Sequence, residues 1–205
     1  MCGIFALLNQ IANNPISYEK IESEFMKGSS RGPEFSVLEN VSIDLKFGFH
    51  RLAINGLNKK SNQPIYFKNI ILICNGEIYN YKALFKALKI KPNTNSDCEI
   101  IIHCYLQFGI EYTLQILDGV FSFVLLDNNP ENTKLFVARD PYGVRPLYIL
   151  ENKKIPGIIC FASEMKMMYD FIDIFNNNNT DNDYIINQFN PGTYSSLFYP
   201  NKILS

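Results

Sequence analysis

The chain has 205 residues, of which 47% are hydrophobic and 19% are charged, which is enough apolar material for a full core. We therefore expect a single domain spanning residues 1–205. The formal net charge of −1 gives no reason to expect a nucleic-acid or anionic-membrane partner. No basic segment precedes the first apolar stretch, and no apolar run approaches about 18 residues, so the sequence predicts a cytoplasmic protein.

The chain opens with Cys2 and Gly3, followed by a buried strand predicted at Ile4–Leu8. We expect removal of Met1, because the next residue is small, and this would leave Cys2 with a free α-amine beside its thiol. An α-amine titrates at about pH 8, so it can accept the thiol proton near neutrality. Cys2 is therefore a candidate nucleophile that carries its own base. The alternative, a cysteine that merely happens to be second, is not excluded by these residues alone.

The numbers of other cysteines and of histidines help to decide whether Cys2 is a nucleophile. Four further cysteines lack metal-type pairing and are expected to be core thiols: Cys74, Cys98, Cys104 and Cys160. Only two histidines exist, His50 and His103. A Cys–His dyad is therefore disfavoured, which favours a nucleophile with its own base.

Next, a turn is expected at Asn13–Pro15, and Ser17 can cap a helix that ends at Gly28. The following loop, Ser29–Glu34, contains one guanidinium, Arg31, beside glycine and proline. Two interpretations remain open at this point: a simple connector, or a lid over a small polar ligand.

The stretch Ile43–Arg51 alternates between apolar and polar residues, as in a strand with one buried face. By that parity Arg51 falls on the apolar side, together with Phe47 and Phe49. A buried charge needs a partner. Arg51 is therefore a candidate clamp for a carboxylate, unless the chain turns there and exposes it.

A continuous apolar run at Ile70–Cys74 predicts a strand buried on both faces. It ends at Asn75-Gly76, and a helix is predicted at Tyr81–Leu88, so we expect a strand–turn–helix corner here. Such a corner presents a backbone N–H and a side-chain amide together, as an oxyanion hole requires. Ser96–Glu99 resembles a capping box before a helix that ends at Gly109, which places Asp97 in the first turn.

The remainder of the chain is predicted to be mainly sheet. Apolar runs separated by short turns indicate strands at Val120–Leu126, Leu135–Ala138, Leu147–Leu150 and Gly157–Ala162, with a last strand opening at Pro191–Ser195. The polar run Asn176–Asp183 is expected to be a flexible loop. The pattern predicts an α+β fold of two packed antiparallel sheets with helices outside.

Seven motifs in order resemble class II glutamine amidotransferases, in particular the amino-terminal glutaminase half of glutamine-hydrolysing asparagine synthetases of eukaryotic type. The likeness extends from Cys2 to about Tyr194. Its motifs are Met1–Phe5, Arg31–Pro33, Phe49–Ala53, Asn75–Asn80, Asp97–Glu99, Asp118–Phe121 and Arg139–Leu147. The resemblance implies a four-layer αββα sandwich of the N-terminal-nucleophile hydrolase type.

The resemblance also implies a role for each matching residue. Cys2 would attack the side-chain amide of L-glutamine to give a γ-glutamyl thioester, then glutamate and ammonia. Asn75 and Gly76 would form the oxyanion hole, and Arg51 would bind the α-carboxylate. The α-ammonium would be bound by Glu77 and Asp97. Backbone groups of the segment after Arg51 would line the same site: Leu52, Ala53, Ile54 and Asn55.

Two substitutions and one missing region depart from the family pattern. Ser30 replaces the usual histidine before Arg31, and Glu34 replaces the usual aspartate, both in the lid loop. The 205 residues contain no loop like the ATP-pyrophosphatase loop of the synthetase half. We therefore expect no metal or cofactor site in this chain, ATP and magnesium belonging to a synthetase domain elsewhere. Ammonia would serve asparagine synthesis in a separate partner, whereas the alternative is a module that binds glutamine or a partner without turnover.

Overall fold

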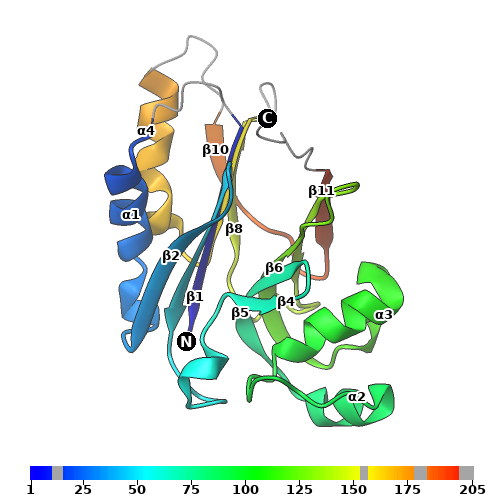
Figure 1. The fold of residues 1–205 in the computed structure, drawn as a ribbon. Coiled ribbons are helices and arrows are strands. Elements are labelled where there is room, and N and C mark those ends of the chain that lie inside the picture. Colours follow the sequence, from blue (N-terminus) through cyan, green and yellow to red (C-terminus); the bar gives the residue numbers. More distant parts are fainter. Residues whose placement is uncertain (11–15, 153–156, 178–183, 199–205) are drawn as a thin grey trace. The chain divides into compact units, whose positions relative to one another are not determined.

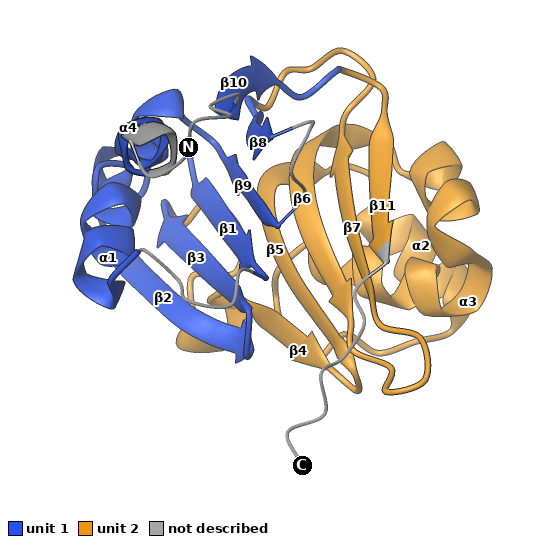
Figure 2. Cartoon of the chain, turned by 90° about the horizontal axis from the view of Figure 1, so that it is seen from above, with its two compact units in different colours: residues 1–52, 146–190 blue, residues 53–145, 191–205 orange. Residues whose placement is uncertain are grey.

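The computed structural model describes residues 1–10, 16–152, 157–177 and 184–198 (Figure 1). The chain forms two compact units whose segments alternate along the sequence (Figure 2). Unit 1 contains Met1–Leu52 and Pro146–Asn190, and unit 2 contains Ala53–Arg145 and Pro191–Ser205. Each unit has its own antiparallel sheet and its own helices. The predicted turn at Asn13–Pro15 lies outside the described residues.

The sheet of unit 1 has six antiparallel strands in the order β10-β8-β9-β1-β3-β2. Its strands are β1 (Gly3–Asn9), β2 (Phe35–Ser42), β3 (Leu45–Arg51), β8 (Tyr148–Asn152), β9 (Ile158–Ala162) and β10 (Tyr184–Gln188). The most amino-terminal strand, β1, lies inside the sheet between β3 and β9. It is almost completely buried, which confirms the strand predicted after Cys2.

Helices α1 (Tyr18–Met26) and α4 (Tyr169–Asn177) pack on one face of this sheet (Figure 1). The Ser17 side chain caps α1 by accepting a hydrogen bond from the Lys20 N–H, as predicted. Ile21 and Phe25 of α1 pack with residues of alternate parity on β1, such as Phe5. The residues of opposite parity therefore project from the face of the sheet that carries no helix of this unit.

The sheet of unit 2 has five antiparallel strands in the order β11-β7-β6-β5-β4. Its strands are β4 (Ile65–Phe67), β5 (Ile70–Ile78), β6 (Gly119–Asp127), β7 (Lys134–Arg139) and β11 (Tyr194–Phe198). Helices α2 (Tyr81–Leu88) and α3 (Glu99–Ile116) share a core with one face of β5, β6 and β7. This core takes Leu72, Cys74 and Ile78 from β5, which leaves Asn75 and Glu77 on the opposite face.

The predicted capping box at the start of α3 does not form. The helix begins at Glu99, its N-cap residue is Cys98, and no side chain caps it. The Glu99 carboxylate instead accepts hydrogen bonds from the N–H groups of Asn93 and Thr94. The helical segment does not end at Gly109; that residue breaks the helix with φ 78°, and helical structure continues to Ile116.

The predicted corner at Asn75-Gly76 is also wrong. Both residues lie inside β5, paired with Ser122 and Phe121 of β6, and the strand continues to Ile78. The turn into α2 follows at Tyr79 and Asn80. The long partner strand keeps the Asn-Gly pair extended, although such pairs favour turns in isolation.

Four elements were not expected from the sequence: β2, β4, β10 and α4. The predicted polar loop begins two residues too early, since residues 176 and 177 belong to α4, and its residues 178–183 lie outside the described part. The other late strands appear where the apolar runs predicted them. The α+β class with two antiparallel sheets is confirmed.

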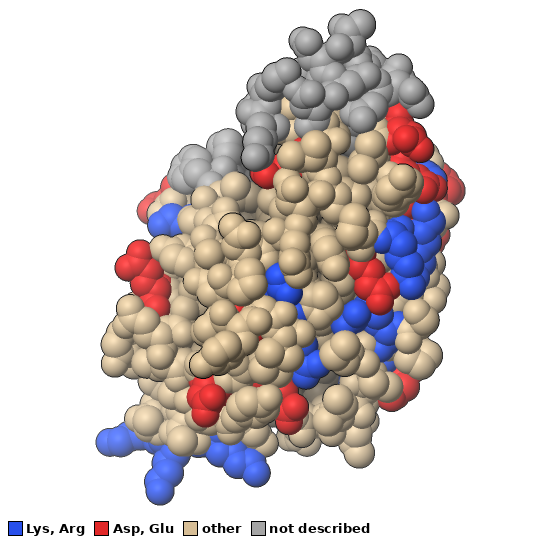
Figure 3. Space-filling view, turned by 180° about the vertical axis from the view of Figure 1, so that it is seen from behind, with Lys and Arg blue, Asp and Glu red and all other residues tan. Residues whose placement is uncertain are grey.

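Short 3₁₀ turns complete the described elements: η1 (Ser29–Arg31), η2 (Lys59–Ser61) and η3 (Met165–Met167). Within the described ranges, no helix is long and apolar enough to span a membrane. Acidic and basic side chains are interspersed among uncharged ones on the face shown in Figure 3.

Candidate functional site

The predicted nucleophile lies at the end of the unit 1 sheet. Gly3 pairs with His50, so extending the register by one residue places Cys2 opposite Arg51. The Cys2 thiol contacts the backbone of Leu52: its S–H donates to the Leu52 carbonyl (3.4 Å), and the Leu52 N–H approaches Sγ at 3.5 Å. Cys2 is partly exposed, whereas the other four cysteines are buried, and none of the five forms a disulfide.

Arg51 has the parity that the alternating pattern predicted. Its neighbours of the same parity on β3, Phe47 and Phe49, are buried on the face away from α1 and α4, and Arg51 itself is 8% exposed. The chain therefore does not turn its guanidinium into solvent. This result leaves the carboxylate-clamp interpretation of Arg51 open and removes the alternative.

The predicted lid loop, Ser29–Glu34, is attached to the same strand end. Its Gly32 lies so close to the backbone of Arg51 that an added Cβ would be 2.4 Å from the Arg51 nitrogen. The Glu34 N–H donates to the Arg51 carbonyl (3.2 Å). Ser30 and Glu34, the two departures from the family pattern, are both exposed.

Arg31 of this loop is hydrogen-bonded to the backbone of Cys2, the predicted nucleophile. Its Nε–H donates to the Cys2 carbonyl (2.8 Å), and its Nη1 pairs with Glu164 Oε1 (3.2 Å). Burial would raise the pKa of Glu164, but hydrogen bonds from Lys166 and Arg31 outweigh it and lower that pKa. The hydroxyl of Ser163 accepts the Ile4 N–H (3.0 Å) and so fixes the next part of β1.

In unit 2, Asn75 and Glu77 project from the same face of β5. Asn75 is 2% exposed, and its Nδ2 has no hydrogen-bond partner in the part of the chain that the structure describes. A buried, unpartnered amide donor is unusual, because leaving it unpaired costs free energy. The Asn75 Nδ2 is therefore available as a donor to a bound molecule.

Gly76 presents a second donor beside Asn75. Along an antiparallel strand, alternate N–H groups point to opposite neighbours. Cys74 and Ile78 direct their N–H groups to the β4 edge, as their bonds to Gln63 and Asp97 show, so the Gly76 N–H points to that edge too. A Cβ on Gly76 would come within 2.7 Å of the Val120 carbonyl, so no other residue fits there without movement.

Asp97 is buried against the end of β5 rather than in the first turn of α3. Its Oδ2 accepts the Ile78 N–H (2.7 Å), and its Oδ1 accepts from Asn55 Nδ2 (3.4 Å). Burial raises the pKa of the Asp97 carboxyl, these hydrogen bonds lower it in part, and the nearby charge of Glu77 raises it further. The net shift of the pKa is upward, because burial and the charge of Glu77 both disfavour the ionised carboxylate.

The segment Leu52–Asn55 crosses from one unit to the other in sequence. Leu52 and Ala53 are half-buried, whereas Ile54 and Asn55 are exposed. Hydrogen bonds join Leu52 to Cys2 and Asn55 to Asp97. No group of three or more metal-ligating side chains occurs among the described residues.

Both histidines bond to groups other than the thiol. Within unit 1, the two ring nitrogens of His50 bond to the Ser36 hydroxyl (2.7 Å) and the Phe25 carbonyl (2.9 Å). Burial lowers the pKa of His50. Within unit 2, His103 pairs with Glu99 at 3.0 Å.

Three residues that hold segments next to the predicted set were missed by sequence reasoning: Gln63, Ser163 and Glu164. The sequence analysis gave none of the three a role. A serine and a glutamate directly after the buried strand β9 were the available signal, since polar residues at strand ends often serve a site. The sequence around Gln63 gave no sign of its contacts, because its partner, Cys74, lies on strand β5.

Comparison with known proteins shows which family the chain matches. The family profile "Glutamine amidotransferase domain" matches residues 1–200. The chain is 42% identical over 171 residues to the asparagine synthetase [glutamine-hydrolyzing] of Mesocricetus auratus, covering 81% of this chain and 29% of that protein. It is 38% identical over 177 residues to a probable asparagine synthetase of Acanthamoeba polyphaga mimivirus, covering 84% and 32%.

Among solved structures, the chain resembles the glutamine phosphoribosylpyrophosphate amidotransferase of B. subtilis, with a TM-score of 0.72 and 20% identity. That match covers 96% of this chain and 47% of the other, and it shows a shared fold. The chain spans only about three tenths of the length of the curated relatives it matches.

Proposed function

Because this chain belongs to the class II glutamine amidotransferase domain family, we propose that it hydrolyses the side-chain amide of L-glutamine by covalent catalysis at Cys2. Removal of Met1 exposes the α-amine, which takes the thiol proton as sulfur attacks the amide carbon. The resulting ammonium group returns the proton to the departing nitrogen, and ammonia leaves a γ-glutamyl thioester. Water, deprotonated by the same amine, then releases glutamate and the thiol.

The oxyanion of each tetrahedral intermediate is stabilised by the Asn75 Nδ2 and the Gly76 N–H. Fixed donors aimed at the developing charge contribute more to catalysis than any other single effect in many enzymes. The buried Asn75 amide nitrogen without a partner among the described residues is the observation that carries this proposal. A purely structural asparagine at 2% exposure would have its donors satisfied.

The charged groups match the two charges of an amino acid. Arg51 binds the α-carboxylate with its planar fork of donors. Asp97 and Glu77 receive the α-ammonium, and backbone groups of Leu52 to Asn55 line the substrate. The engagement of both histidines elsewhere supports a nucleophile that uses its own α-amine as base.

Ammonia released here serves a further reaction. The curated relatives named above are asparagine synthetases of which this chain matches only a part. We therefore propose that the ammonia is used to make asparagine from aspartate in a synthetase domain or subunit, which would also bind ATP and magnesium. In this proposal the chain itself needs no metal or cofactor.

The test is release of ammonia and glutamate from L-glutamine by the purified chain, with its amino terminus determined by mass. We expect hydrolysis only by the fraction that begins at Cys2. In the fraction that keeps Met1 the basic amine has become a non-basic amide. Normal hydrolysis by Met1-bearing chains would contradict the mechanism, and glutamine binding without turnover by Cys2-initiated chains would point to a binding module instead.

A further inference from the structure

Strand β5 loses its neighbour on one side before it reaches the proposed oxyanion donors. β4 pairs with β5 only from Ile70 to Leu72. Beyond that point, three residues direct backbone N–H groups to the uncovered edge: Cys74, Gly76 and Ile78. An uncovered edge is free to shift and to pair with other groups, so its position needs a separate restraint.

The side chain of Gln63 provides that restraint at Cys74. The Cys74 N–H donates to Gln63 Oε1 (2.5 Å), and Gln63 Nε2 donates to the Cys74 carbonyl (3.0 Å). One side-chain amide therefore makes the two hydrogen bonds that a residue of a paired strand would make. Gln63 is 6% exposed, so both bonds are shielded from water.

At the other end, the Asp97 carboxylate accepts the Ile78 N–H, which leaves Gly76 between two occupied positions. Along the uncovered edge after Leu72, the N–H groups of Cys74 and Ile78 are both hydrogen-bonded to side chains. Among the described residues of that edge, the Gly76 N–H is therefore the one available to a bound acceptor. The last restraint before Asn75 and Gly76 in the chain is the pair of bonds to Gln63.

We infer that Gln63 is a positioning residue for the oxyanion donors of the glutaminase reaction. It acts through Cys74, not on the substrate, by fixing the pleat and position of β5 next to Asn75 and Gly76. It also occupies the Cys74 N–H, so that this group does not compete for an anion or for water. The inference rests on the proposed function, because it assigns no second reaction.

Such a role predicts a loss confined to catalysis. Removing an oxyanion donor lowers kcat by roughly 100- to 1000-fold in known enzymes, so misplacing two donors without removing them should lower it by about 10- to 100-fold. KM should stay within about threefold, because Arg51 and Asp97 bind the two charges of glutamine from segments other than β5.

The experiment compares Gln63→Met with Thr113→Val in the full chain. Met keeps the length of the side chain and removes both bonds to Cys74. Thr113 is a matched control: it is buried, and its hydroxyl bonds to the Gly109 carbonyl (2.7 Å) inside α3. Both variants lose buried hydrogen bonds and some thermal stability, but only Gln63→Met should lose kcat.

Gln63→Glu gives a second readout that does not depend on the stability of the first variant. When the introduced carboxyl group is ionised, it accepts from the Cys74 N–H but repels the Cys74 carbonyl, whereas the protonated acid restores both bonds. The ratio of variant to wild-type kcat should therefore rise as pH falls. An equal fall of kcat in both control and test variants, a wild-type kcat in Gln63→Met, or a pH-independent ratio would each overturn the inference.

Failure of the inference and failure of the proposed function give different results. If the wild-type chain releases no ammonia from glutamine, the proposed function fails. If the wild type is active and Cys2 of Gln63→Met still reacts with an electrophilic glutamine analogue at the wild-type affinity, the loss of turnover lies in the oxyanion donors, as inferred. Loss of analogue binding in Gln63→Met would instead assign Gln63 to the substrate site.

Discussion

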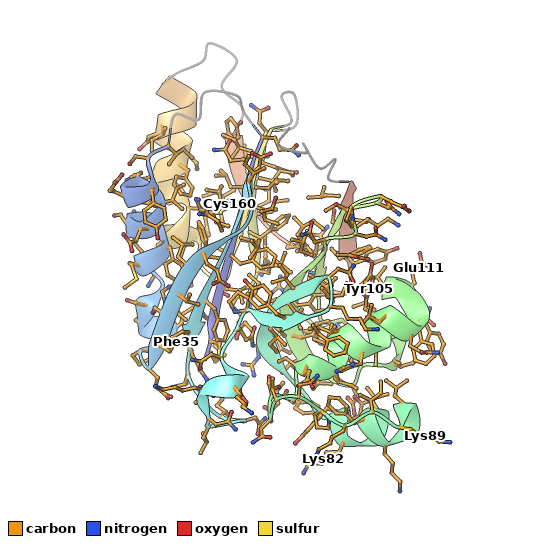
Figure 4. The ribbon with its side chains drawn as sticks, viewed as in Figure 1. Phe35, Lys82, Lys89, Tyr105, Glu111 and Cys160 are labelled. Atoms are coloured by element: carbon orange, nitrogen blue, oxygen red, sulfur yellow. The ribbon has the colours of Figure 1, made fainter. Side chains whose placement is uncertain are left out.

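Among single residues, Cys2 differs from the other cysteines in exposure and in chemistry. Cys74, Cys98, Cys104 and Cys160 are each at most 3% exposed. Burial raises the pKa of Cys104 to about 11 and that of Cys160 well above its ordinary value. Figure 4 labels Cys160 among the strands of unit 1. A thiol that is both buried and protonated is a poor nucleophile.

An electrophilic glutamine analogue should therefore label Cys2 and none of the other four thiols. Cys2→Ala should abolish both labelling and glutamine hydrolysis, while the thermal unfolding temperature stays close to that of the wild type. Peptide mass mapping and an ammonia assay provide the measurements. Stoichiometric labelling at Cys74 or Cys98 would disprove the assignment of the nucleophile.

Arg51→Ala should chiefly raise KM for glutamine. Loss of a charge-assisted pair from a desolvated site costs roughly 2–4 kcal/mol, or about 30- to 1000-fold in affinity. Arg51→Lys should recover only part of this, because lysine lacks the planar fork that binds a carboxylate at two points. Steady-state kinetics measures both, and a wild-type KM in Arg51→Ala would remove this residue from the site.

Asp97 should make glutamine binding depend on pH. Its folded-state pKa is raised, so the carboxylate that pairs with the α-ammonium forms only as the pH rises through that pKa. KM for glutamine should therefore fall as the pH is raised from acidic values towards neutrality. Asp97→Asn should raise KM by roughly 30-fold and flatten this dependence. Glu77→Gln serves as the comparison, and an unchanged pH profile of KM in Asp97→Asn would exclude the role.

The sequence predicts the strand face of candidate site residues such as Arg51, but it does not predict the contacts that these residues make. Parity along one strand predicts the face of Arg51 correctly, because alternation is a property of the strand itself. The partners of Asp97 could not be predicted: Asn55 and the Ile78 N–H come from separate segments that only the fold brings together. For the same reason Gln63 appeared to be an ordinary loop residue.

At the scale of elements, the loop before α3 depends on one buried carboxylate, that of Glu99. Glu99 and His103 are 1% and 3% exposed, and the Glu99 carboxylate also accepts from Asn93 and Thr94. Burial would raise the pKa of Glu99, but the hydrogen bonds from His103, Thr94 and Asn93 outweigh it and lower that pKa to about 2. The loop that these bonds hold leads directly to Asp97.

The chain should therefore lose stability in acid through Glu99. Its folded pKa is depressed, so the stabilisation is complete above the ordinary value of 4.5 and disappears as the pH falls from there through about 2. The wild type should lose on the order of 3 kcal/mol across that interval from this group. Glu99→Gln should be less stable at neutral pH and show a weaker acid dependence, measured by urea unfolding at several pH values. Parallel pH profiles for the two chains would contradict this.

Two errors of the sequence reasoning arise from the way strands pair in the fold. Strand β2 is largely exposed or half-buried and lies at the edge of its sheet, so it lacks the clear apolar alternation of an inner strand. The Asn75-Gly76 pair gave the opposite error, because its local preference predicted a turn. Nine consecutive pairings with β6 keep β5 extended there instead. In both cases the pairing of strands in the fold, and not the local sequence, determined the structure.

At the scale of the whole molecule, the fold class followed from the count of apolar runs, but the assignment of strands to sheets did not. Each unit combines early and late segments, and each sheet contains strands far apart in sequence. Local patterns report which residues are extended, and they contain no information on which distant strand becomes the neighbour. The single-domain expectation stays a prediction.

The chain should form no asparagine from aspartate, ATP and glutamine by itself. Activation of a carboxylate with ATP needs a phosphate cradle and a bound metal ion. The described residues contain no cluster of three potential metal ligands. We expect glutaminase activity to be low alone and to rise when a synthetase partner is supplied. Calorimetric titration with ATP and magnesium tests the first point, and measurable binding would reveal a second site.

The position of β1 inside its sheet has a consequence for biosynthesis. The Ile4 N–H bonds to the Ser163 hydroxyl across 159 positions of the sequence, and β9 is one of the two neighbours of β1. Translation produces Cys2 and β1 long before Ser163 and β9, which immobilise β1. A nascent chain would therefore carry its reactive thiol unrestrained, and amide hydrolysis would begin only once the late strands have closed around the amino terminus.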